Sequence, residues 1–318
     1  MKAALVTHLR QAAPVYADFP TPTAAEGQRL VQVTASSISH VTKSRASGAH
    51  YSSEGGLPFV AGIDGVGVCE DGQRVYFFLP EHPLGAMAEY CVLDEQFCLA
   101  LPDALEDSHT AAMMIPAMSS WAALLERVQL RKDETVLING ATGISGRLAV
   151  QIAKYLGASK VIATGRHAAS LEALRDLGAD VTVSLTQDSN ALQAALKQEF
   201  AQGVDVVLDY LWGESAEALI AAAARFGPDG VPVRYVQIGS VSGGNINLPS
   251  AALRSSALQM MGSGMGSVAM PRLLAVMAEV LAAAPAAGFQ IATLNLPLAQ
   301  VEQAWTMDDT RERIVLRP

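Results

Sequence analysis

The stretch Thr135-Val-Leu-Ile-Asn-Gly-Ala-Thr-Gly-Ile-Ser-Gly146 joins a short apolar run to a group of small residues. The run from 135 to 139 has the length and composition of a buried strand, and the sequence from 146 onward predicts a helix. Ala141 would permit a tight turn, Gly143 would let the backbone approach a phosphate, and Gly146 would allow close packing of helix on strand. Because the first N–H groups of a helix favour an anion, the stretch predicts a diphosphate-binding turn. The alternative is a glycine-rich turn that binds no ligand.

Strand and helix patterns alternate through the region that follows this turn. Further strands are expected at 161–164, 181–185, 204–209, 235–238 and 257–261, and helices at 146–156, 170–177, 190–200, 215–226 and 271–284. Apolar strands separated by helices predict right-handed crossovers and a parallel sheet. Six such strands are typical of a doubly wound, dinucleotide-binding Rossmann fold, so the fold class is α/β.

The sequence before residue 113 has a different pattern of hydrophobic and turn-forming residues. Short strand patterns at 1–6, 29–35, 74–79 and 88–93 are separated by glycine and proline turns, which predicts a small β-rich domain. Strand patterns return at 291–296 and 313–316, and we expect this tail to rejoin the first domain. The expected domains are therefore 1-113 with 268-318, and 114-267.

Composition limits the classes of partner and of compartment. Of 318 residues, half are hydrophobic and 17% are charged, with a formal net charge of -9. This composition predicts a globular chain, and its acidity argues against a nucleic-acid partner. The three cysteines form no CxxC pair and are expected to be reduced thiols. The apolar stretch 273–287 is interrupted by Glu279 and Pro285 and is too short for a bilayer, so we expect a soluble cytoplasmic protein without a membrane partner.

The end of the second predicted strand bears on the choice of dinucleotide. An NAD site would place an acid there, about 20 residues after the glycines. The sequence from Ser159 to Ser170 has no acid and instead contains Thr164-Gly165-Arg166-His167. A guanidinium can pair with a ribose 2′-phosphate, which predicts NADPH as the cofactor. The alternative is that Arg166 is an ordinary surface charge.

Several segments in fixed order resemble a known family. They are Val33–His40, Ala61–Gly67, Gly85–Tyr90, Pro116–Leu124, the glycine turn, Asp205–Asp209 and Val236–Gly239. Together they resemble the medium-chain dehydrogenase/reductases, and among these the zinc-independent quinone oxidoreductases. The resemblance implies a β-rich GroES-like substrate and catalytic domain that is interrupted by the Rossmann NADP-binding domain. It also implies a homodimer, because relatives often associate through the edge strand that matches 257–261.

Zinc-dependent members of the family take metal ligands from three places. The resemblance puts these on Ser39, on Ile63, and on or near Ile115. A hydrocarbon side chain cannot bind Zn²⁺, and a catalytic zinc needs three protein ligands with N, S or O donors. We therefore expect no zinc and no other metal.

A site without metal favours an acceptor that delocalises the incoming negative charge by itself. Quinones and α,β-unsaturated carbonyls do so, because hydride addition gives a phenolate or an enolate. The expected function is NADPH-dependent reduction of such a small-molecule substrate. Two alternatives stay open, namely a zinc-free carbonyl reductase or alcohol dehydrogenase, and a noncatalytic NADPH-binding redox sensor.

The expected catalytic residues are Tyr51, Ser39 and Ser119, which the resemblance places near the substrate or the nicotinamide. The Tyr51 phenol could hydrogen-bond a carbonyl or supply a proton, or it could be an ordinary loop tyrosine. Thr42 stands where the family usually has Asp. Trp121 and Asp64 are expected to serve the core rather than the chemistry.

The expected cofactor-binding residues lie at the carboxyl ends of the strands. They are Ala141, Thr142, Gly143, Ile144, Ser145, Gly146, Thr164, Gly165, Arg166, His167, Asp209, Tyr210, Gly239 and Ser240. The glycine-rich loop 262–266 either closes over the cofactor or is simply a turn.

Overall fold

The chain divides into two compact units in a computed structural model, which describes residues 1–9, 13–50, 56–308 and 310–318. Unit 1 comprises Met1–Ile115 and Met277–Pro318, and unit 2 comprises Pro116–Val276. The second division falls inside helix α8 (Met270–Ala287) rather than ahead of it. The expected domain limits therefore stay a prediction.

Unit 2 contains a six-stranded sheet whose order is β11-β10-β9-β12-β13-β14. The strands are β9 (Thr135–Asn139), β10 (Lys160–Gly165), β11 (Val181–Ser184), β12 (Val206–Asp209), β13 (Val233–Gln237) and β14 (Leu258–Gly262). Every pairing is parallel. Written from β9, the order is that of the doubly wound dinucleotide-binding fold, which confirms the predicted fold class.

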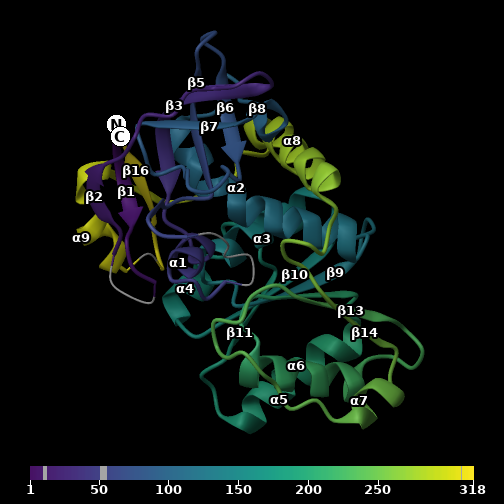
Figure 1. The fold of residues 1–318 in the computed structure, drawn as a ribbon. Coiled ribbons are helices and arrows are strands. Elements are labelled where there is room, and N and C mark those ends of the chain that lie inside the picture. The colour runs from purple at the N-terminus through teal and green to yellow at the C-terminus, as the bar shows by residue number, and fades with distance from the viewer. Residues whose placement is uncertain (10–12, 51–55, 309) are drawn as a thin grey trace. The chain divides into compact units, whose positions relative to one another are not determined.

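Helices cover both faces of this sheet (Figure 1). Helix α3 (Ile144–Tyr155) lies on one face, and α5 (Ser189–Gln202) and α6 (Gly213–Phe226) lie on the other. Leu196 and Phe200 of α5 pack with Leu219 of α6 and with strand residues such as Leu137 and Val207 in one apolar core. The predicted helix at 170–177 is shorter than expected: α4 (Ala168–Glu172) is followed by turns in which Arg175, Leu177 and Gly178 donate to carbonyls three residues back.

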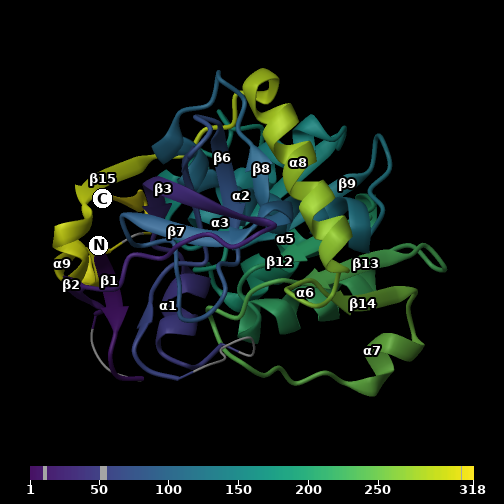
Figure 2. The same ribbon diagram turned by 45° about the horizontal axis from the view of Figure 1, so that its top comes forward.

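Unit 1 is β-rich, as expected. One sheet has the order β15-β16-β3-β5-β6-β8, with β7 paired to β3, and a smaller one has the order β2-β1-β4. The strands are β1 (Lys2–Val6), β2 (Val15–Asp18), β3 (Gln28–Ser37), β4 (Phe59–Val60), β5 (Asp64–Cys69), β6 (Arg74–Phe78), β7 (Tyr90–Asp94), β8 (Cys98–Ala100), β15 (Thr293–Pro297) and β16 (Arg313–Arg317). Strand β16 pairs with β3, so the C-terminal tail does rejoin unit 1. Both termini lie beside β1, β2 and α9 (Val301–Thr306) in Figures 1 and 2.

The sequence patterns missed β2, β4, β5 and β8 and three helices that lie wholly or partly in unit 1, α9 among them. Strand β5 alternates glycine with apolar residues, and this hides the pattern of a strand. A Cβ atom at Gly65 would lie 2.7 Å from the Phe77 ring, and one at Gly67 would lie 2.4 Å from the Gln32 carbonyl oxygen. Helix α1 (His40–Ala46) has only seven residues, and α2 (Asp107–Ala122) has apolar residues on several faces. Neither presents a clear amphipathic stripe.

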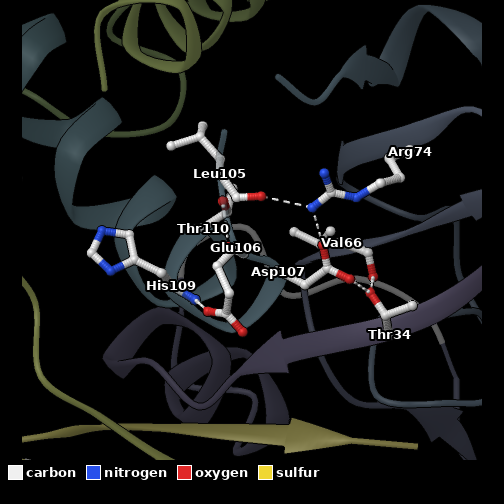
Figure 3. A network of polar contacts seen from close by, with 8 residues as sticks. All are labelled: Thr34, Val66, Arg74, Leu105, Glu106, Asp107, His109 and Thr110. Carbon is white, nitrogen blue, oxygen red and sulfur yellow. Dashed lines mark hydrogen bonds and ion pairs between the residues drawn. The ribbon is translucent and has the colours of Figure 1, made fainter. Parts of the chain in front are cut away.

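Polar contacts anchor the first turn of α2 within unit 1 (Figure 3). Arg74 donates to the Leu105 carbonyl at 2.7 Å and forms an ion pair with Asp107. Thr34 donates to the other carboxylate oxygen of Asp107 at 2.6 Å. Glu106 accepts the backbone N–H of His109 at 2.8 Å, which satisfies one of the free donors at the start of the helix.

Helix α8 is longer than its sequence predicted, because it continues through Pro285. By length and composition it is the one helix of the described ranges that could cross a membrane. Its residues Leu273, Val276, Met277 and Val280 are nonetheless buried, and a core helix passes the same test. Its composition is therefore weak evidence for a membrane span.

A buried ionisable group lies in the core of unit 1. Asp64 is fully buried; its Oδ2 accepts the Tyr76 hydroxyl at 3.1 Å, and its Oδ1 has no partner among the described residues. Burial raises the pKa of Asp64 to about 7, while the Tyr76 hydrogen bond and the Arg313 charge act to lower it. Arg313 itself donates to the Ile38 carbonyl at 3.0 Å. The expectation that Asp64 serves the core agrees with this environment.

This carboxyl group should make stability depend on pH. Its folded-state pKa is raised, so the folded protein binds the proton more tightly than the unfolded chain does. The free energy of unfolding of the wild type should fall, relative to Asp64→Asn, as the pH rises from about 4 to about 7, by at most about 4 kcal/mol. Urea unfolding across this range measures the difference, with exposed Asp103→Asn as the control. A constant difference between wild type and Asp64→Asn would contradict the prediction.

Candidate cofactor-binding site

The glycine turn between β9 and α3 has the predicted strand–turn–helix form, with one correction. The left-handed residue is Gly140, with φ of 84°, and not Ala141. Ala141 is fully buried, and its N–H donates to the Thr164 carbonyl at 2.8 Å. The tight turn thus depends on Gly140 and not on the predicted Ala141, and Ala141 links the turn to the end of β10.

Gly143 and Gly146 differ in what surrounds them. A Cβ atom at Gly146 would lie 2.4 Å from the Gly140 carbonyl oxygen and 2.5 Å from the Ala141 Cα atom. Only glycine allows the first turn of α3 to pack this closely on the turn before it. A Cβ atom at Gly143 would have the Gly140 oxygen as its nearest neighbour, at 3.7 Å. The space beside Gly143 is open, as approach of a phosphate to the backbone requires.

The N-terminus of α3 fits an anionic group. Gly143 is the N-cap residue, with extended backbone angles, and it has no side chain that could cap the helix. The first N–H groups of a helix lack intrahelical acceptors, and the helix dipole adds positive potential at this end. These donors come from Ile144, Ser145 and Gly146, on a 12-residue helix with a buried apolar face. The residues present therefore fit the diphosphate of a dinucleotide.

A buried polar network lies beneath the turn and joins the ends of three strands. Asn139 donates to Asp209 at 2.8 Å and accepts the Thr164 hydroxyl at 2.7 Å. The Asp209 carboxylate also accepts the N–H groups of Leu211 and Trp212, at 2.9 and 3.1 Å, and the Tyr235 hydroxyl at 2.7 Å. Thr164 and Asp209 are 0% exposed. Their side chains hold the strand ends together, so a direct contact between the Asp209 carboxylate and a ribose is disfavoured.

The end of β10 presents a free cation. Arg166 is exposed and forms no ion pair or hydrogen bond with residues in the described ranges. His167 caps α4: its Nδ1 accepts the Ser170 N–H at 3.4 Å. Gly165 is buried, and a Cβ atom there would lie 2.5 Å from the Thr142 side chain. The loop is therefore held close to the glycine turn while the Arg166 guanidinium faces solvent.

The ends of β12 and β13 contribute a second polar contact. The Tyr210 hydroxyl lies 2.8 Å from Ser120 Oγ, and Ser120 also donates to the Pro116 carbonyl at 2.9 Å. A Cβ atom at Gly239 would lie 2.5 Å from the Tyr210 carbonyl oxygen, whereas Ser240 is exposed. Tyr210 is therefore engaged with α2, and sequence reasoning missed its partner Ser120 because no local pattern links them.

The glycine loop after β14 is held by one side chain. Arg127, in a π-helical turn (Ala123–Arg127) after α2, donates to the Gly262 carbonyl at 2.9 Å and to the Ser267 carbonyl at 3.1 Å. Ser263 donates to the Gln237 carbonyl at 2.9 Å, next to the end of β13. The loop is therefore tied at both of its ends, which favours a fixed turn over a freely moving cover.

The expected catalytic residues lie in different surroundings. Ser39 is buried at the N-cap of α1, where its Oγ accepts the Thr42 N–H at 3.2 Å and lies 2.9 Å from Thr42 Oγ1. Ser119 is half-buried on α2, and its hydroxyl has no hydrogen-bond partner within the part of the chain that is described. Tyr51 lies outside the described residues. Trp121 is buried, with its ring 5.9 Å from that of Tyr155, which agrees with the core role expected of it.

The positions that correspond to zinc ligands carry no ligand set. Ser39 is occupied by its contacts with Thr42, and Ile63 is a buried hydrocarbon side chain. Among the residues that the structure describes, no three His, Cys, Asp or Glu side chains are grouped as a metal site would require. The donor chemistry at these positions does not fit Zn²⁺.

Comparison with known proteins identifies the family to which the chain is related. The model of the zinc-binding dehydrogenase family matches residues 146–279, a segment that does not include Ser39 or Ile63. A protein of Emericella nidulans named as a probable NADPH-dependent quinone reductase is 30% identical over the whole of both chains. The NADPH-dependent alkenal/one oxidoreductase of Arabidopsis thaliana is 30% identical over 53% of this chain and 47% of its own length.

Solved structures match the whole chain. The quinone oxidoreductase of Thermus thermophilus, also solved in complex with NADPH, has a TM-score of 0.84 at 25% identity and is covered completely. The Escherichia coli quinone oxidoreductase complexed with NADPH has a TM-score of 0.85 at 20% identity, again over both full chains. The second likeness concerns the fold alone.

The two glycines of the turn should respond differently to a methyl group. Gly146→Ala should lower the free energy of unfolding by about 2 kcal/mol, because the Cβ atom meets backbone that cannot yield. Gly143→Ala should lower the free energy of unfolding by less than about 1 kcal/mol. It should nevertheless weaken NADPH binding, because the methyl group occupies the open side of the helix start. Urea unfolding and NADPH fluorescence titration measure the two effects. Equal destabilisation, or unchanged NADPH affinity in Gly143→Ala, would contradict this account.

Proposed function

Since the chain belongs to the medium-chain dehydrogenase/reductase superfamily, among its quinone oxidoreductase-like members, we propose that it is an NADPH-dependent, zinc-independent oxidoreductase that reduces a quinone or an α,β-unsaturated carbonyl. The observation that carries this proposal is the open, uncapped start of α3 beside Gly143, with an unpaired Arg166 at the end of the next strand. The names of the relatives, which include a quinone reductase and an alkenal/one oxidoreductase, support the class of acceptor.

Different groups of the protein would bind different parts of the cofactor. Backbone amides of residues 144–146 would bind the diphosphate, with the open side of Gly143 allowing its approach, and Arg166 would pair with the ribose 2′-phosphate. Thr142, Gly165 and His167 surround these contacts, while Ala141, Thr164 and Asp209 hold the strand ends in place. Tyr210, Gly239 and Ser240 end the next two strands, where the nicotinamide half of the cofactor is expected. Bound NADPH would supply a hydride from C4 of its nicotinamide.

On the acceptor side, the residues must stabilise the oxygen that gains negative charge. Ser39 Oγ already accepts one N–H from Thr42, so its hydroxyl hydrogen can be donated either to Thr42 Oγ1 or to a bound carbonyl oxygen. Ser119 has a hydroxyl free for a ligand, in contrast to the engaged Ser120. We keep Tyr51 as the proposed proton donor of the site.

The assembly and compartment are also part of this proposal. Strand β14 is an end strand of its sheet, which supports pairing with the same strand of a second copy and thus a homodimer. Cys69, Cys91 and Cys98 are free, and burial raises the pKa of the Cys91 thiol to about 12, which supports a reducing, cytoplasmic setting. The net charge of -9 disfavours nucleic acid as a partner. Light scattering would give twice the chain mass for the dimer and the chain mass if this is wrong.

A panel of acceptors tests the function. NADPH oxidation should be fast with a quinone and with an enone, and at least about 100-fold slower in kcat/KM with a saturated ketone, because only the first two delocalise the charge they receive. Fast reduction of the ketone would favour the carbonyl reductase alternative. Tight NADPH binding without turnover of any acceptor would favour the noncatalytic sensor.

The choice of cofactor should depend on Arg166. The wild type should prefer NADPH to NADH, and Arg166→Gln should lower kcat/KM for NADPH by about 10- to 100-fold, the loss expected for one charge-assisted contact, while leaving the value for NADH nearly unchanged. Arg175→Gln, at an exposed arginine of the same unit, is the matched control. If the variant lost activity equally with both cofactors, Arg166 would not read the 2′-phosphate.

A further inference from the structure

The segment 135–171, which includes β9, α3 and β10, is basic although the chain as a whole is acidic. It contains no Asp or Glu but four Lys or Arg side chains, in a protein with a net charge of -9. Lys154 and Lys160 each form an ion pair with an acid from a later segment. Arg147 and Arg166 form none with residues in the described ranges. The two unpaired cations of the segment thus belong to the helix and the strand end that adjoin the glycine turn.

Arg147, on α3, is the half-buried member of this unpaired pair. Its Nε atom is buried, and it has no hydrogen-bond partner within the part of the chain that the structure describes. Helix α3 contains no Asp or Glu, so no carboxylate can pair with the guanidinium from three or four residues away on the same helix. A buried cationic donor without a partner lowers the stability of the folded protein. Sequences that break such a rule usually do so at functional sites, where a ligand can satisfy the group.

The position of Arg147 on the helix makes the unpaired charge more costly. Arg147 lies four residues after the N-cap residue Gly143, and its backbone N–H donates to the Gly143 carbonyl at 2.9 Å. The start of a helix carries positive potential, which disfavours a cation and favours an anion. Helical side chains lean toward the N-terminus, and four residues rise by about 6 Å, a distance that an arginine side chain can span. The guanidinium can therefore reach the level of the open side of Gly143.

From these observations we infer that Arg147 is a second cofactor-binding cation, which pairs with the diphosphate of the dinucleotide while Arg166 pairs with the ribose 2′-phosphate. A guanidinium binds phosphate oxygens through two parallel hydrogen bonds, and an anion at this place would offset both the unpaired charge and the positive end of the helix. The inference rests on the proposed function and adds a residue to it. Arg147 contributes to the affinity for either dinucleotide, whereas Arg166 contributes to the choice between them.

A set of ligands separates the roles of the two arginines. Arg147→Gln should weaken the binding of NADPH and of NADH by the same factor, about tenfold, because both carry the diphosphate. It should leave the affinity for 2′-AMP unchanged, because this ligand has the 2′-phosphate but no diphosphate. Arg166→Gln should give the opposite pattern, with weaker binding of NADPH and 2′-AMP but not of NADH. Fluorescence titration measures the two reduced dinucleotides, and calorimetry measures 2′-AMP. Arg131→Gln, at an exposed arginine ahead of β9, is the control and should change none of the three affinities.

Two outcomes of these titrations would overturn the inference. The first is an unchanged affinity for NADH in Arg147→Gln, and the second is an equal loss of affinity for 2′-AMP. A fourth ligand, 2′-phospho-ADP-ribose, keeps the diphosphate but lacks the nicotinamide, and Arg147→Gln should bind it about tenfold more weakly as well. If only the ligands with a nicotinamide lost affinity, Arg147 would contact that ring and the inference would be wrong.

The stability of the cofactor-free protein gives a second readout. Arg147→Met keeps an unbranched side chain and removes the unpaired charge, so its urea midpoint without cofactor should equal or exceed that of the wild type. Saturating NADPH should raise the midpoint of the wild type more than that of the variant. A lower midpoint without cofactor would show that Arg147 holds the fold, and the inference would fail. If the wild type bound neither dinucleotide, the proposed function would fail; if it bound both and Arg147→Gln bound them equally well, only this inference would fail.

Discussion

The nucleotide-binding unit depends on one close approach, between the first turn of α3 and the backbone that leaves β9. A Cβ atom at Gly146 would lie only 2.5 Å from the Ala141 Cα atom. Because glycine has no side chain, the first turn of α3 can pack this closely on the preceding turn. This approach places the uncapped amides of the helix directly beyond the strand. Asn139, Thr164 and Asp209 then fix the ends of β9, β10 and β12 beneath it through buried hydrogen bonds. A buried network of this kind is rigid because each member is satisfied by another.

The two units use charge in opposite ways. In unit 2 the proposed binding groups are backbone N–H donors and the exposed Arg166, and the buried carboxylate of Asp209 accepts hydrogen bonds from two backbone N–H groups and two side chains. In unit 1 the carboxyl group of Asp64 is buried, one of its oxygens has no partner among the residues that the structure describes, and burial raises its pKa to about 7. In the proposed function, the phosphates of NADPH would be bound by local donors that act against the net charge of -9.

Much of the fold could be predicted because unit 2 is built from local patterns. Strand β9 was predicted to the residue, and the parallel sheet was predicted from the alternation of apolar strands with helices. The failures have physical causes: β5 is hidden by glycines that the neighbouring strand and Phe77 require, and α2 is apolar on too many faces for its pattern to show. At the candidate site, the sequence predicted the strand–turn–helix form of the turn. The contact between Tyr210 and Ser120 was not predicted, because the two residues are 90 positions apart.

The sequence by itself determined the class of the chain: a parallel six-stranded sheet, a turn that can accept a diphosphate, and hydrocarbon where zinc-dependent relatives need a ligand. These follow from residue type and spacing, which act over a few neighbours. Only the tertiary structure decided what each polar side chain is for. It showed that the Asp209 side chain is buried and holds the strand ends together, and it placed the left-handed residue of the tight turn at Gly140 and not at Ala141. Such roles depend on partners distant in the chain, and the packing of the fold brings those partners together.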